Sequence, residues 1–187
     1  MKHDNDSGQS LIELALTLPL LMLLLLGAVE LGQLAYGAIN VSNAAKSATQ
    51  YGAQMAGTMV DTQGILAAAQ DEIAIPGQVG SLDMPMPVAM PDGSALPASD
   101  KLDCNPTNGS YACSYCTCSN PDVAHLTTPF NCATAVVTGV NPTCTNNSHL
   151  EQNLIITTHV VVQPILHLPG LPATFNMYGH AVVKRLQ

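Results

Sequence analysis

The chain has 187 residues, enough for one domain or two small ones, and 10% of them are charged while 47% are hydrophobic. Low charge with high apolar content excludes a disordered tail and is atypical of a cytosolic enzyme. The formal net charge of −8, without any basic stripe, argues against a nucleic-acid partner, because such a chain repels a phosphate backbone.

The N-terminus combines a short polar leader with a long apolar segment. The leader ends in Gly8, and the fifth residue after this glycine is Glu13. The segment 14–29 contains no charged residue, and if Glu30 is tolerated the uncharged pattern continues to Ile39. A membrane-spanning helix needs about 20 predominantly apolar residues, so a single span is predicted here. The two glutamates would lie roughly 26 Å apart along a helix, which lets each sit near an interface of a bilayer.

Three interpretations of this segment remain open. A secretory signal peptide would be cleaved near residues 35–37, a plain anchor would stay intact, and a prepilin-type protein would be cleaved between Gly8 and Gln9. We favour the third, because it makes Glu13 the fifth residue of the mature chain, a carboxylate in an apolar setting that needs a partner. Pro19 is expected to kink or locally loosen the helix.

This layout resembles the processing site of type IV prepilin-like proteins, and residues 8–56 resemble the TadE-like family of the bacterial tight-adherence (Tad) pilus system. The resemblance implies cleavage by a prepilin peptidase and packing of the N-terminal helix against other pilin or pseudopilin subunits. In that packing Glu13 pairs with the α-amino group of a neighbouring subunit and sets the register, and Glu30 makes a further subunit contact. It also implies a pilus-assembly protein for adhesion, with no enzymatic activity.

The long helix is predicted over residues 9–59, beyond the membrane. Small and apolar residues follow alternating steps of three and four, which is a heptad-like seam. The seam comprises Leu31, Leu34, Ala38, Val41, Ala45, Ala48, Gly52, Met55 and Met59. It packs on the chain's own C-terminal part, on other subunits, or on both at different depths. A second helix is predicted after a cap at Asp61 or Thr62.

The fold class predicted for the rest of the chain is α+β, with a small antiparallel sheet. Prolines punctuate an irregular loop over 76–109, with a short strand near 78–82. The β-branched run 154–162 and the alternating run 174–186 are predicted to pair antiparallel, with a strand over 110–118 joining their sheet.

All six cysteines lie within 104–144, in a head that we assign to residues 60–187. An even, clustered set behind a membrane anchor predicts disulfides in an oxidising compartment, with the N-terminus inside, a single pass through the inner membrane and the head periplasmic or extracellular. Pairs are expected to join the strand over 110–118 to Cys132 and Cys144, which leaves Cys104 without an assigned partner. The disulfide candidates are Cys104, Cys113, Cys116, Cys118, Cys132 and Cys144.

No catalytic, cofactor-binding or metal site is predicted. Cys113 and Cys116 have a nominal zinc spacing, but in a strand they point to opposite faces. His159 and His180 could meet across paired strands, yet no recognised motif surrounds them. Two alternatives stay open: an unprocessed single-span envelope protein whose head binds a ligand or partner, and a metal-binding periplasmic protein with free thiols. Within the favoured class, the long head favours a minor pilin or pseudopilin over a major pilin.

Overall fold

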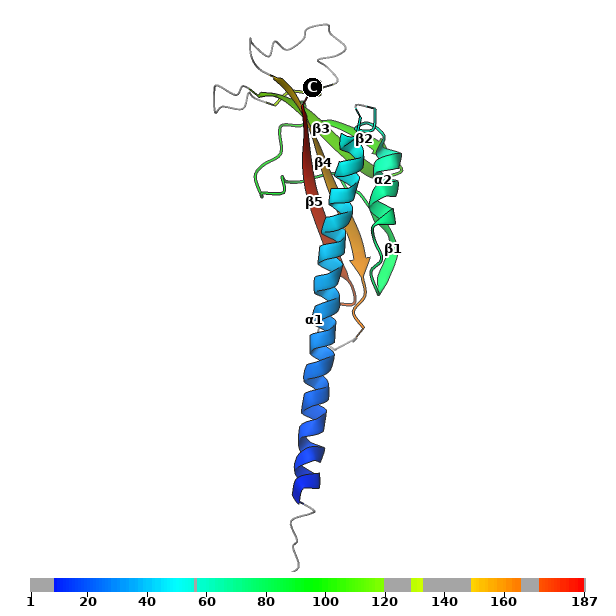
Figure 1. Ribbon diagram of the computed structural model, residues 1–187, viewed down its shortest axis with the longest axis vertical. Coiled ribbons are helices and arrows are strands. Elements are labelled where there is room, and N and C mark those ends of the chain that lie inside the picture. Colours follow the sequence, from blue (N-terminus) through cyan, green and yellow to red (C-terminus); the bar gives the residue numbers. More distant parts are fainter. Residues whose placement is uncertain (1–8, 56, 120–128, 133–148, 166–171, 187) are drawn as a thin grey trace, which may run out of the picture.

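The computed structural model describes residues 9–55, 57–119, 129–132, 149–165 and 172–186. Over these residues the chain is α+β. A long N-terminal helix carries the head along its C-terminal half, and its N-terminal half extends beyond the head (Figure 1). The elements are α1 (Gln9–Ala53), α2 (Thr62–Asp71), β1 (Gln78–Asp83), β2 (Asp103–Thr107), β3 (Ser110–Ser119), β4 (His149–Val162) and β5 (Phe175–Leu186). The predicted fold class is confirmed.

The helix α1 ends at Ala53, before the predicted end at residue 59. The hydroxyl of Thr58 donates to the carbonyl oxygen of Gly52 at 3.0 Å and accepts from the backbone N–H of Met55 at 3.0 Å. These bonds satisfy groups that the last turn of a helix leaves without a partner. The chain therefore turns here, and Met55, which was predicted on the seam, is exposed.

The sheet is organised around β4, which pairs with strands on both of its edges. One edge pairs with β5 along the whole of β5. The other edge pairs with β3 in its first half and with β1 in its second half, and β2 pairs with the far side of β3. All of these pairings are antiparallel. The predicted pairing of the two C-terminal strands, and the addition of the cysteine-rich strand, are confirmed.

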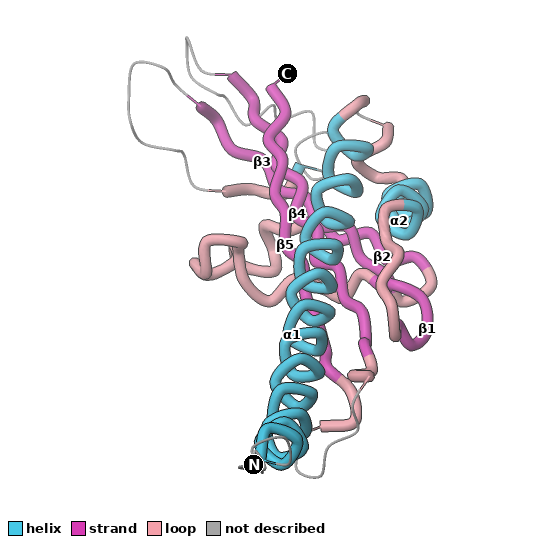
Figure 2. The backbone as a smooth tube through the Cα atoms, turned by 60° about the horizontal axis from the view of Figure 1, so that its bottom comes forward, coloured by secondary structure: helices cyan, strands magenta, loops and turns pink. Residues whose placement is uncertain are grey.

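The C-terminal half of α1 lies along one face of this sheet, with α2 beside its end (Figure 2). The main core joins both helices to the sheet and includes Ala44, Ala48, Ile65, Leu154 and Ile156, all fully buried. On the opposite face, the segment between β1 and β2 packs apolar side chains onto the sheet. The part of the predicted seam from Val41 to Gly52 thus packs on the chain's own head.

The lower part of the seam was predicted with the wrong phase. Leu31 is 69% exposed, whereas Glu30, Gln33 and Gly37 face the head. A seam with steps averaging 3.5 residues drifts around a straight helix, which has 3.6 residues per turn. Below Val41 the buried face follows steps of four, four and three residues, whereas the predicted seam followed steps of three, four and three, so the two differ by one residue.

The backbone of α1 approaches the sheet closely at Gly179 of β5. A Cβ atom added there would meet the carbonyl oxygen of Val41 and the hydroxyl oxygen of Thr158. The Thr158 hydroxyl is fully buried and donates to that same Val41 carbonyl at 2.9 Å. A glycine in β5 and a threonine in β4 thus let the helix backbone contact the sheet directly.

Two disulfides are described, one of them between positions that face each other in a strand pair. Cys104 of β2 is bonded to Cys113 of β3, and Cys116 is bonded to Cys132. Cys118 is disulfide-bonded as well, while Cys144 lies outside the described residues. The predicted link from this strand to Cys132 is confirmed.

The bond of Cys104 to Cys113 adds to the sequence prediction, which linked the cysteine-rich strand to Cys132 and Cys144 without fixing the pairs and assigned no partner to Cys104. The prediction treated residues 76–109 as an irregular loop, so β2 was missed. Its Pro106 is tolerated because β2 lies at the edge of the sheet, where a missing N–H costs no ladder bond.

The start of α2 is capped by Asp61, as predicted. Its carboxylate accepts from the backbone N–H of Gly64 at 3.1 Å and from the hydroxyl of Tyr51 at 2.9 Å. Both bonds favour the charged carboxylate, and the bond from Gly64 makes the larger contribution to holding the pKa of Asp61 below its ordinary value.

This lowered pKa predicts a pH dependence of stability. A carboxyl whose pKa is depressed by folding stabilises the head above its unfolded pKa, and the contribution is lost as the pH falls through the folded pKa. Asp61→Asn keeps a good capping residue but cannot titrate. We therefore expect the unfolding midpoint of the wild type to fall more steeply than that of Asp61→Asn below about pH 4. Thermal melts of both proteins across this range test the expectation, and parallel curves would contradict it.

Candidate functional site

The N-terminal half of α1 is an apolar surface that the described head does not cover. Its large apolar side chains, from Leu11 to Val29, are exposed by 44% at Leu26 to 74% at Leu16. The helix is long and apolar enough to cross a membrane. Apolar surface of this extent requires a covering, either lipid or other helices.

The predicted processing and registry residues lie at the start of this surface. Gly8 lies outside the described residues, and Gln9 is the first residue of α1. Glu13 follows one turn later and is exposed, so its carboxylate is accessible to a partner outside the chain. Pro19 lies inside α1, which continues through it to Ala53. The predicted kink at Pro19 stays a prediction.

A second polar feature of α1 lies where the head begins. Glu30 and Gln33 are each only 9% exposed. The backbone N–H of Ile165, just after β4, donates to Oε2 of Glu30 at 3.1 Å. The Nε2 atom of Gln33 donates to the carbonyl oxygen of Pro76, just before β1, at 2.7 Å. Two side chains one turn apart therefore attach both segments at the base of the head to α1. We call this pair the basal clasp.

The two segments held by the basal clasp are also bonded to each other. The backbone N–H of Gln163 donates to the carbonyl oxygen of Gly77 at 2.8 Å. Gly77 has a φ of +77°, and a Cβ there would meet both the Gln163 carbonyl and the amide of Gln33. Glycine is required at this position, because the left-handed conformation and the lack of space both exclude a side chain.

The role predicted for Glu30 was a contact with another subunit. Its carboxylate contacts the chain's own backbone, at a residue 135 positions away in the sequence, and a contact of Glu30 with another subunit stays a prediction. Gln33 was not singled out by the sequence, and its partner is 43 positions away. The signal that could have found Gln33 is its position one turn after Glu30, on the same helical face.

Removal of the Glu30 carboxylate is expected to loosen the base of the head. In Glu30→Ala the N–H of Ile165 loses a hydrogen bond to a carboxylate, a bond that contributes about 1.5–3 kcal/mol, whereas Glu30→Gln keeps an oxygen acceptor. We expect amide hydrogen exchange at Ile165 to accelerate by roughly tenfold or more in Glu30→Ala and by less in Glu30→Gln. Unchanged exchange in Glu30→Ala would show that this bond does not hold the segment.

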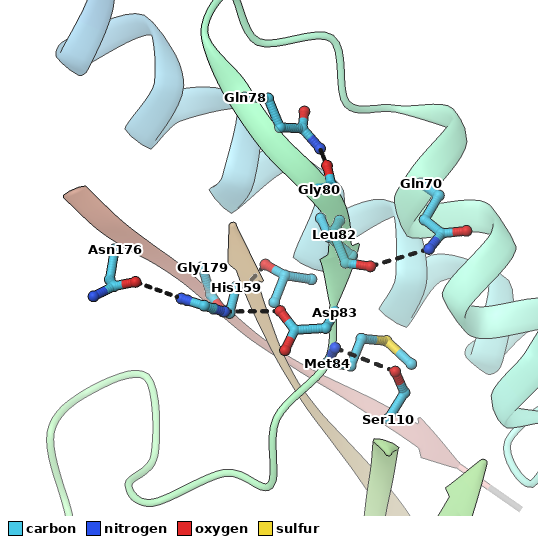
Figure 3. Close-up of polar contacts among 11 residues, drawn as sticks. Gln70, Gln78, Gly80, Leu82, Asp83, Met84, Ser110, His159, Asn176 and Gly179 are labelled. Carbon is cyan, nitrogen blue, oxygen red and sulfur yellow. Dashed lines mark hydrogen bonds and ion pairs between the residues drawn. The ribbon is translucent and has the colours of Figure 1, made fainter. Parts of the chain in front are cut away.

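Two histidines of the sheet, His159 and His180, have hydrogen-bond partners within it. His159 of β4 lies between Asp83 of β1, at 2.8 Å from Nδ1, and Asn176 of β5, at 3.1 Å from Nε2 (Figure 3). Its ring also stacks on Tyr178, with the ring centroids 4.7 Å apart. His180 lies opposite Thr157 rather than opposite His159. His159 thus connects three strands across the sheet face away from α1.

Among the described residues, no three His, Cys, Asp or Glu side chains gather to hold a metal ion. An open hollow of about 340 Å³ lies beside His180 and Tyr178, and its other walls are Pro85, Met86, Val88 and Thr157. This lining is mainly apolar, and its polar groups are the Thr157 hydroxyl, the Tyr178 hydroxyl and the His180 ring.

Comparison with known proteins identifies the N-terminal segment. Residues 8–50 match the sequence model of the family described as TadE-like protein, and this range contains most of α1. No curated protein and no solved structure matches the chain. The TadE-like family is a structural component of Tad pili, which indicates a pilin-like, membrane-anchored protein associated with such a pilus. By the segment that forms its long helix, this chain is similar to TadE-like proteins.

Proposed function

We propose that the protein is a minor pilin or pseudopilin of a Tad-type adhesive pilus, a subunit that acts by packing and not by catalysis. The observation that carries the proposal is the division of α1 into an exposed apolar half and a half bound to the head. Such a subunit can leave the bilayer and bury the same surface against other helices while its head stays unchanged. The size of the head supports a minor subunit rather than a major one.

We also propose that a prepilin peptidase cleaves the chain between Gly8 and Gln9, which would expose the α-amino group of Gln9. The new α-ammonium group of Gln9 would stand at the N-terminus of α1, where the helix dipole disfavours a positive charge. Glu13 is a carboxylate in an apolar setting and needs a cation. Pairing of Glu13 with the α-ammonium group of a neighbouring subunit would satisfy both groups and fix the register of the two helices.

The location proposed is the inner membrane, crossed once, with the head on the periplasmic or extracellular side. The disulfides of the head support this orientation, because such bonds persist in oxidising compartments. Incorporation into a pilus would carry the head outward with the helix.

The test is the intact mass of the non-reduced protein, taken from membranes and from sheared pili of its own host. We expect a chain that starts at Gln9 and is present in both fractions. A chain that keeps its leader and is absent from pili would favour the plain envelope anchor. A start near Ala38 would mean that the apolar segment is a signal peptide.

A further inference from the structure

The segment that follows β4 returns to α1 at the edge of the expected membrane span. The uncharged run 14–29 is roughly 24 Å long as a helix, against a hydrocarbon thickness of ~30 Å, so Glu30 lies at the boundary of the hydrocarbon. The bond of 3.1 Å from the Ile165 N–H to Glu30 fixes Ile165 at the same depth.

The composition of this segment suits a lipid interface. The described residues of this segment, 163–165 and 172–175, contain no Asp, Glu, Lys or Arg. Ile165 is 60% exposed, although Pro164 beside it is buried. An exposed isoleucine on a water-facing surface is ordinary, but at this depth the surroundings of the side chain are the bilayer and not bulk water.

The exposed apolar surface of α1 also continues above Glu30. Leu31 is 69% exposed, Tyr36 52% and Ile39 60%. Tyr36 lies about 9 Å further along the helix than Glu30, and tyrosine is enriched at the headgroup level of membranes. Along the helix axis, Ile165 therefore lies between the apolar surface of the membrane span and Tyr36.

We propose that the base of the head is a second membrane contact, in which Ile165 enters the bilayer interface beside α1. The occupant of this surface is lipid, because the surface is continuous with the membrane-spanning helix. The contact also explains how a charge is tolerated at this depth. Glu30 faces the head and is bonded to its backbone, so the segment at Ile165 separates the carboxylate from lipid. The inference rests on membrane anchoring by α1 and not on the pilus assignment.

The chain contains no tryptophan, so a single introduced tryptophan reports its own surroundings. The full-length Ile165→Trp protein is placed as single copies in lipid nanodiscs that contain nitroxide-labelled lipids. The label is carried near the headgroup in one set and near the chain end in the other. Leu21→Trp, within the span, is the buried control, and Val88→Trp, at an 86% exposed site of the head, is the water-exposed control.

We expect Ile165→Trp to be quenched more than Val88→Trp, and more strongly by the headgroup-side label than by the chain-end label. Leu21→Trp should show the reverse preference for the label. Emission from Ile165→Trp like that of Val88→Trp, with Leu21→Trp quenched, would overturn the second contact and leave the anchor intact. If the tryptophan of Ile165→Trp is shielded from water in sheared pili but not in nanodiscs, the second membrane contact is likewise overturned, and Ile165 contacts another subunit. An unquenched Leu21→Trp would refute the anchor and the contact together.

Discussion

Substitution of Gly179 by alanine is expected to destabilise the head by about 2–4 kcal/mol. The new Cβ atom would meet the Val41 carbonyl oxygen and the Thr158 hydroxyl oxygen. The carbonyl belongs to the helix backbone and cannot turn aside, because the neighbouring Ala44 is packed without exposed surface in the core. Relief requires α1 to move off the sheet, which also weakens the buried bond from Thr158 to Val41.

A matched control for this substitution is Gly37→Ala. Gly37 lies on α1, one turn before Val41 and on the same face of the helix. Its Cβ would meet the sulfur of Met177 at 2.8 Å, which is the far part of a flexible side chain that can rotate away. Alanine also favours a helix over glycine by about 1 kcal/mol, so Gly37→Ala should be close to neutral. Denaturant titrations of both full-length proteins in the same detergent, followed by near-ultraviolet circular dichroism, measure the difference. Equal losses of stability would contradict a backbone contact at Gly179.

The elements with strong local signals could be predicted from the sequence. The uncharged apolar run gave α1, and the β-branched run with the alternating run gave β4 and β5. The weak strand β2 could not be found this way, because Pro106 and the surrounding prolines are typical of a loop. Its place in the sheet depends on a turn at Asn108 and Gly109, both with positive φ, which returns the chain along itself.

The candidate site was predicted as a set of residues but not as a set of contacts. Glu30 was singled out because a charge near the bilayer requires a reason. Its partner could not be inferred, because a backbone N–H has no sequence signature and lies at the far end of the chain. The same holds for Gly179 and Thr158, whose roles arise only when β4 and β5 meet α1. For Glu30 the phase of the helix face mattered as well, because the 3.5-residue pattern placed the buried face one residue away, at Leu31.

Replacement of Cys116 and Cys132 together by alanine is expected to lower the stability of the head by about 3 kcal/mol. The bond joins residues 16 positions apart, and its loss enlarges the freedom of the unfolded chain. It also holds the segment around Phe130 against β3. There the backbone N–H and carbonyl of Phe130 are each bonded to Cys116 at 2.9 Å. We therefore expect faster amide exchange at Phe130 as well as a lower unfolding midpoint.

The control is the paired replacement of Cys104 and Cys113 by alanine, so that each variant loses one complete bond and gains no free thiol. These residues are 9 positions apart, and the shorter loop predicts a loss about half a kcal/mol smaller. The strands β2 and β3 also stay joined by five paired positions and their tight turn. Amide exchange at Phe130 should be unaffected in this second variant. If it accelerates equally in both, the segment is held by the general stability of the head and not by its own disulfide.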